Sequence, residues 1–128
     1  MDLLIDTHVF IWWDGATSRL GKQAGELISA PDNRVFISAA SVWEIAIKRR
    51  LGRIAFKGVI AEAVRANDFE VVPCEAEDGE LAGDLNWSHT DPFDRMIVAQ
   101  AQRRRFTLVT ADRAMMAWPG VAMITAEG

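Results

Sequence analysis

The chain has 128 residues, a length that fits one domain, residues 1–128, with a single hydrophobic core. Half of the residues are hydrophobic, a quarter are charged, and the apolar runs are too short to span a membrane, which predicts a cytoplasmic protein. The net charge of −4 is unfavourable for binding phosphate backbones, and the single cysteine, Cys74, excludes an internal disulfide and a cysteine-rich metal site.

The first half of the chain alternates short apolar runs with segments of helical spacing. Leu3-Leu4-Ile5 predicts a buried strand that leads into a helix start at Asp6, and Val35-Phe36-Ile37 predicts a second strand. Between them, Thr17–Ala30 has the apolar spacing of a helix and is followed by a proline. After the second strand, serines at 38 and 41 open a strongly periodic helix that reaches residue 51, with Gly52 as its expected C-cap.

The second half continues the alternation. The remaining predicted elements are helices at 59–66, 75–85, 91–104 and 112–118, and strands at 69–72, 106–109 and 121–124. Because strands and helices alternate without a repeat or a linker, we expect an α/β fold, a three-layer domain whose mainly parallel central sheet is flanked by helices.

Four acidic residues occupy similar places along this pattern. Asp6 directly follows the first strand, and Asp112 lies just past the fourth. Glu44 belongs to the first turns of the helix after the second strand, and Asp94 to the first turn of the helix that begins at Asp91. The carboxyl ends of parallel strands share one edge of a sheet, so these side chains are expected to meet in one cleft.

Carboxylates gathered in one cleft repel one another, which raises their pKa values and destabilises their charged forms. A hard divalent cation such as Mg²⁺ or Mn²⁺ removes this repulsion and prefers oxygen ligands. His8 and His89 are too few and too scattered to argue for zinc. The acids therefore predict a magnesium or manganese site.

Each acid also has a purely structural interpretation. Glu44 follows Ser41 at the spacing of a capping box, in which it would accept from a backbone N–H. Asp91-Pro-Phe-Asp94 fits an N-cap aspartate, a proline in the first helical position and an acid in the third. Asp6 and Asp112 can likewise cap the helices that follow them.

Four motifs in order carry a resemblance to a known family. They are Leu3-Leu-Ile-Asp6-Thr7-His8, Ser41-Val-Trp-Glu44-Ile, His89-Thr-Asp91-Pro-Phe-Asp94-Arg95 and Leu108-Val-Thr110-Ala-Asp112-Arg113. Together they resemble the PIN-domain ribonucleases, specifically the VapC toxins of type II toxin–antitoxin systems. The resemblance spans nearly the whole chain, and the ordered set is far more specific than any single motif.

The resemblance implies a metal-dependent endoribonuclease that hydrolyses RNA phosphodiester bonds. By position, Asp6, Glu44, Asp94 and Asp112 correspond to the acids that hold Mg²⁺ or Mn²⁺ and act in catalysis. Thr7 and Thr110 correspond to small hydroxyl residues that support the first and last acids. The family also implies a homodimer, and a VapB-type antitoxin that occupies the active-site groove. Ala114 stands where some members have a further acid, which leaves the number of metal ions open.

Several other residues near these motifs have two interpretations each. Asp91 is an N-cap or an additional metal-linked acid, and Arg95 contacts either an RNA phosphate or a neighbouring carboxylate. Trp12, Trp13 and Trp43 are placed in the core or a dimer interface rather than under stacked RNA bases. His89 and Cys74 are expected to be structural.

The basic runs at 48–50 and 103–105 fit either a nucleic-acid surface or solvated helix ends.

Two competing functions remain for the chain as a whole. A non-catalytic PIN-fold interaction module would keep the fold without the chemistry, although all four acids are present. A phosphoryl-transfer domain fits poorly, because the second acid of the phosphatase pattern is replaced by His8, and the late lysine of a receiver is missing after Lys57.

Overall fold

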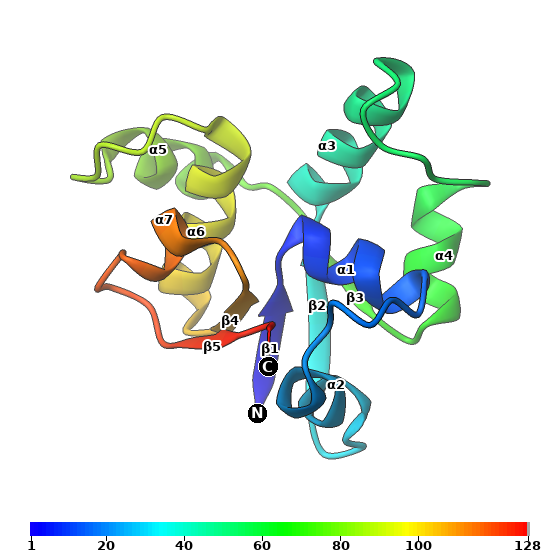
Figure 1. The fold of residues 1–128 in the computed structure, drawn as a ribbon. Helices are drawn as coiled ribbons and strands as arrows, with labels where there is room; N and C mark the ends of the chain where they lie inside the picture. Colours follow the sequence, from blue (N-terminus) through cyan, green and yellow to red (C-terminus); the bar gives the residue numbers. More distant parts are fainter. Residues whose placement is uncertain (128) are drawn as a thin grey trace.

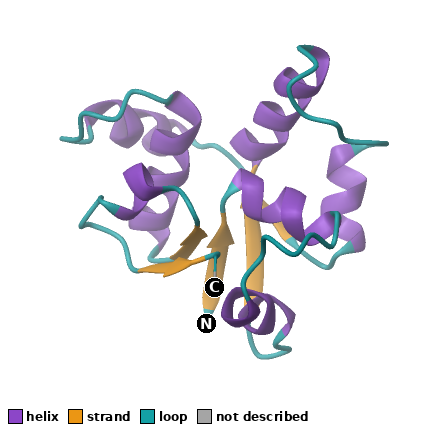
Figure 2. Cartoon of the chain, in the orientation of Figure 1, coloured by secondary structure: helices purple, strands orange, loops and turns teal. Residues whose placement is uncertain are grey.

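The computed structural model describes residues 1–127, which form a five-stranded sheet between two layers of helices (Figures 1 and 2). The strands are β1 (Asp2–Ile5), β2 (Arg34–Ser38), β3 (Glu70–Val72), β4 (Thr107–Thr110) and β5 (Met123–Thr125). The helices are α1 (Thr7–Asp14), α2 (Lys22–Ser29), α3 (Ala39–Arg50), α4 (Ile60–Ala66), α5 (Ala76–Asp84), α6 (Pro92–Arg104) and α7 (Arg113–Met116). The expected α/β three-layer architecture is confirmed.

All paired strands run parallel, in the order β3-β2-β1-β4-β5. From β1 the next two strands along the chain, β2 and β3, are added on one side. The last two, β4 and β5, are added on the other side of β1. In register, Leu4 of β1 lies opposite Phe36 of β2 and Leu108 of β4. The direction of winding therefore reverses between β1 and β4, and a parallel sheet opens a ligand crevice at the carboxyl ends of the strands at such a point.

Alternating residues of the central strands build two separate cores, which explains their continuous apolar runs. Leu3 and Ile5 pack with residues of α1 to α4 on one face of the sheet. Leu4 and Leu108 pack on the other face with residues of α6 such as Ile97. Both faces of β1 are thus buried, and the residue that follows the strand is fixed firmly in space.

The largest difference from the sequence expectation is the start of the second helix. The pattern predicted a helix over Thr17–Ala30, but α2 begins only at Lys22. The Thr17 hydroxyl accepts from the N–H of Arg19 in a local turn, and the N–H of Gly21 donates over 2.7 Å to the carbonyl of Ala126. Gly21 is therefore tied to the C-terminal segment. No helix within residues 1–127 is long and apolar enough to cross a membrane.

Candidate active site

Asp6 lies where the winding of the sheet reverses. Its N–H donates to the carbonyl of Val109, so its backbone is fixed between β1 and β4. One carboxylate oxygen accepts from the N–H of Thr7 over 2.6 Å, and the other accepts from the Thr110 hydroxyl over 2.7 Å. Burial raises the pKa of Asp6, and the nearby Glu44 carboxylate adds to the rise against these hydrogen bonds. Asp6 is thus the N-cap of α1, and its buried carboxylate is fixed in orientation by these two hydrogen bonds.

Glu44 points from α3 toward Asp6. It is buried, and its carboxylate accepts from the Thr7 hydroxyl and from Lys48 Nζ, each over 2.6 Å. The capping-box interpretation of Glu44 is wrong, because the helix is capped by Ser38, three residues before Ser41. Ser41 instead lies in the helix, with its hydroxyl 2.9 Å from the Thr7 hydroxyl.

Asp94 faces the same space from α6. Asp91 is the N-cap of this helix and accepts from the N–H of Asp94 over 2.9 Å. The Asp94 carboxylate lies 2.7 Å from His89 Nε2. Burial raises the pKa of Asp94 to about 7, and the carboxylates of Asp91, Asp6 and Asp112 contribute to the rise, while the contact with His89 opposes it.

Asp112 completes the group at the end of β4. It caps α7 by accepting from the N–H groups of Ala114 and Met115 over 2.8 and 3.2 Å. Its own N–H donates to the Thr110 hydroxyl, which in turn donates to Asp6. Thr110 therefore links the first and last acids, and Thr7 links Asp6 to Glu44. The structural interpretation of Asp112 as a cap is also correct.

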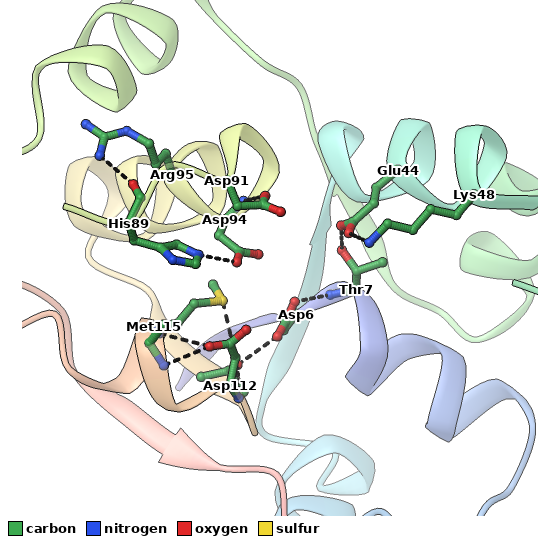
Figure 3. A network of polar contacts seen from close by, with 12 residues as sticks. Asp6, Thr7, Glu44, Lys48, His89, Asp91, Asp94, Arg95, Asp112 and Met115 are labelled. Carbon is green, nitrogen blue, oxygen red and sulfur yellow. Dashed lines mark hydrogen bonds and ion pairs between the residues drawn. The ribbon is translucent and has the colours of Figure 1, made fainter. Parts of the chain in front are cut away.

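Figure 3 shows the acids facing one another across the crevice between α1, α3, α6 and α7. The group consists of Asp6, Glu44, Asp91, Asp94 and Asp112. Their oxygens are engaged by hydroxyl groups, a lysine, a histidine and helix N–H groups. In the described part of the chain, no three His, Cys, Asp or Glu side chains converge closely enough to form a ready cation site.

The chemistry of this group nevertheless fits a hard divalent cation. Its central donors are carboxylate oxygens, the type that Mg²⁺ and Mn²⁺ prefer. The raised pKa values of Asp6 and Asp94 show that their negative charges are incompletely compensated by the protein. A cation would compensate them, provided that side chains such as Glu44 and Asp94 rotate away from their present partners.

The crevice is open to a ligand beside Asp6 and Asp112. A pocket of about 270 Å³ lies there, and its lining includes His8, Trp12 and Arg19. The Arg19 guanidinium lies 4.7 Å from the centre of the Trp12 ring. A larger hollow of about 520 Å³ lies at the other edge of the sheet, near the starts of β2 and β3, and none of the four predicted acids lines it.

Arg95 has a different role from either one expected. Its three guanidinium nitrogens donate to five backbone carbonyls. Two of these, of Ala82 and Gly83, lie at the end of α5, and three, of Leu85, Trp87 and His89, lie in the segment between α5 and α6. Within residues 1–127 Arg95 forms no ion pair with a carboxylate, and its nitrogens, engaged with carbonyls, are poorly placed for a phosphate. Arg95 therefore supports the site indirectly, because it holds the segment that carries His89.

Two contacts of the site were missed by sequence reasoning. His89, expected to be structural, contacts Asp94, and Lys48, assigned only to a basic run, contacts Glu44. The spacing of Glu44 and Lys48, four residues apart on a helix, was a signal for the second contact. Nothing local indicated the first, because it depends on the path of the segment before α6.

The three tryptophans separate into two groups. Trp12 is buried and Trp13 is partly buried, donating to the side chain of Asn67 over 3.1 Å, so both pack as expected. Trp43 is 62% exposed, with its ring 5.2 Å from that of Phe93. The core placement of Trp43 is therefore wrong, and the dimer-interface interpretation stays a prediction.

Comparison with known proteins gives a family and a fold. The family model of the PIN domain matches residues 3–117. No curated protein matches the chain in sequence.

Several solved structures superpose over nearly the whole chain. VapBC2 from Rickettsia felis, bound to a DNA fragment from its promoter, gives a TM-score of 0.68 at 14% identity and covers 98% of each chain. DNA-bound VapBC from Salmonella typhimurium gives 0.68 at 18% identity, again over 98% of each chain. VapBC-5 from Mycobacterium tuberculosis, a member of the VapBC family of toxin–antitoxin systems, gives 0.60 at 20% identity over 99% of this chain and 98% of its own. At these identities the likeness establishes the fold.

Proposed function

The chain belongs to the PIN-domain family, and from this premise we propose that it is a Mg²⁺- or Mn²⁺-dependent endoribonuclease, the VapC-type toxin of a toxin–antitoxin pair. The observation that carries the proposal is that Asp6, Glu44, Asp94 and Asp112 face the same crevice, where the winding of the sheet reverses. These acids come from four separate parts of the chain, and burial and mutual repulsion raise the pKa of two of them. Helix capping alone explains neither the convergence nor the position of Glu44.

The chain's own residues have distinct parts in this proposal. Asp6, Asp94 and Asp112 are the proposed cation ligands, and Glu44 is either a ligand or the base that orients the attacking water. Thr7 and Thr110 keep two of these carboxylates in fixed orientations through their hydroxyl groups. A divalent cation held there would lower the pKa of the attacking water and stabilise charge on the scissile phosphate.

Substrate binding also needs the cation, because the acidic crevice by itself repels a phosphate backbone. The pocket beside Asp6 and Asp112 has His8 and Arg19 in its lining, and these side chains are candidates for phosphate contacts. Single-stranded RNA is the favoured substrate form, because its bases and backbone can enter a crevice that a duplex cannot.

The direct test is incubation of the purified protein with cellular RNA. We expect cleavage in Mg²⁺ or Mn²⁺, and complete inhibition by EDTA. Mn²⁺ at about 100 times its Kd should also stabilise the fold by about 2.7 kcal/mol, seen as a higher melting temperature. A protein that neither cuts RNA nor gains stability from Mn²⁺ would instead be a non-catalytic interaction module.

The proposal includes two protein partners, a VapB-type antitoxin and a second copy of this chain. It places the protein and both partners in the cytoplasm. The similar structures named above are toxin–antitoxin complexes, and exposed Trp43 and Leu51 offer apolar surface on and beside α3. We expect the product of a short neighbouring gene to copurify with the chain and to inhibit cleavage. Light scattering should give about twice the 14.2 kDa of one chain. A monomeric mass would remove the homodimer from the proposal and leave the nuclease intact.

A further inference from the structure

Lys48 places a positive charge inside the acidic group. Its Nζ lies 2.6 Å from the Glu44 carboxylate, whose side chain is 4% exposed, whereas the lysine side chain itself is 28% exposed. Burial acts to lower the pKa of Lys48, but the bond with Glu44 and the charges of Asp91 and Asp94 raise it overall. The ammonium therefore partly neutralises the acidic group, and Figure 3 shows Lys48 reaching the Glu44 carboxylate.

This ion pair differs from an ordinary pair on a helix surface. Lys22 and Glu26 have the same four-residue spacing, but their charged atoms are 4.0 Å apart and the side chains are 91% and 67% exposed. Such pairs contribute little, because water screens them. Glu44 is buried and also accepts from Thr7, so Lys48 compensates a charge that water cannot reach.

Binding of an ammonium group and a divalent cation to the same carboxylate at once is electrostatically unfavourable. Two positive charges a few ångströms apart repel strongly at a partly buried site. Lys48 has four flexible methylene groups and is partly exposed, so it can leave Glu44 toward the open side of the crevice. A phosphate of the RNA backbone is the anion that it would meet there.

We propose that Lys48 occupies Glu44 in the metal-free protein and moves to a backbone phosphate of the RNA when Glu44 takes its cation. This inference rests on the proposed function with Glu44 as a cation ligand, and it makes Lys48 a positioning residue that couples cation loading to RNA binding. The exchange makes and breaks no covalent bond: the ammonium group leaves the Glu44 carboxylate and pairs with a phosphate oxygen.

The first test is calorimetric titration of Mn²⁺ into the 128-residue chain after metal has been removed with EDTA. Lys48→Met removes a competing positive charge, so its Kd for Mn²⁺ should be lower than that of the wild type by about tenfold. Arg50→Met is the matched control, because Arg50 is exposed two residues later on the same helix, and its Kd should stay within about twofold of the wild type.

The second test is binding of a labelled single-stranded RNA in Ca²⁺ and in EDTA. In Ca²⁺, Lys48→Met should bind about tenfold more weakly than the wild type, with a salt slope smaller by about 0.7 for one lost phosphate contact. In EDTA both proteins should bind the RNA weakly and the difference between them should be much smaller than in Ca²⁺, because Lys48 then remains on Glu44. If Lys48→Met fails to fold, Lys48→Gln replaces it, because its amide can still donate to Glu44.

The outcomes separate this inference from the proposed function. Wild-type protein that binds no Mn²⁺ would overturn both. Wild-type protein that binds Mn²⁺ with the same Kd as Lys48→Met would overturn the inference and leave the nuclease proposal standing. An RNA deficit of equal size in Ca²⁺ and EDTA would make Lys48 a fixed phosphate contact and would also overturn the exchange.

Discussion

Asp6→Asn should reduce the rate of RNA cleavage by at least about a hundredfold. Loss of a group that only supports a metal ligand already costs up to about a hundredfold, and Asp6 is itself a proposed ligand. The substitution keeps the size of the side chain and an oxygen that accepts from the N–H of Thr7, so α1 keeps its cap. It removes the negative charge between β1 and β4, where the proposed cation binds. The measurement is the initial rate on a defined RNA in saturating Mn²⁺.

The same variant should fold at least as stably as the wild type when metal is absent. Because burial raises the pKa of Asp6 in the folded chain, its ionised form opposes folding near neutral pH, and the neutral amide does not carry that penalty. Its melting temperature should no longer rise with Mn²⁺. Asp32→Asn, at an exposed turn, is the control and should match the wild type in rate and metal response. Unchanged cleavage by Asp6→Asn would remove Asp6 from the proposed site.

Asp78→Ala should lower the free energy of unfolding by about 2–3 kcal/mol, because the partners of a buried charge are left unpaired. Asp78 is fully buried in α5 and forms an ion pair with Arg103 of α6. Its carboxylate also accepts from the N–H of Glu75 over 2.9 Å, which caps α5. The measurement is urea unfolding at pH 7. Glu77→Ala is the control, because its 66% exposed carboxylate lies 3.9 Å from Arg103 and should contribute less than about 0.5 kcal/mol.

The effect of Asp78 should depend on pH in a defined direction. Burial acts to raise the pKa of Asp78, but the N–H of Glu75 and the guanidinium of Arg103 lower it overall, below the ordinary value of 3.8. Its stabilising contribution is therefore complete above the pKa of the unfolded chain and is lost as the pH falls through the folded pKa. The difference between wild type and Asp78→Ala should narrow below about pH 4. A difference that grows in acid would contradict this assignment.

The sequence predicted the elements and the position of the acids, because both depend on local pattern and on the parallel topology. Apolar runs marked the strands, and residues after parallel strands had to share one edge. The capping box predicted from Ser41 and Glu44 was wrong because the same three-residue spacing also occurs inside a helix. Only the backbone shows that Ser38 is the N-cap of α3. The start of α2 was missed because Gly21 bonds to Ala126, a partner far along the chain.

The contacts between side chains could be predicted from the sequence much less well than the elements. The run at 103–105 was considered as a nucleic-acid surface or a solvated helix end. Instead, Arg103 forms an ion pair with Asp78 of α5, and Arg104 forms one with Glu75, the N-cap of α5. The contact of His89 with Asp94 depends on the five carbonyls that Arg95 holds. Such contacts depend on how α5, α6 and the segment between them pack, which no local spacing encodes.

The hydroxyl of Thr110 joins two residues separated by almost the full length of the chain, since it donates to Asp6 and accepts from Asp112. During synthesis Asp6 emerges first, and its partner Thr110 follows 104 residues later. The crevice therefore cannot assemble on a half-made polypeptide. The site of the proposed nuclease is therefore complete only after β4 has left the exit tunnel of the ribosome.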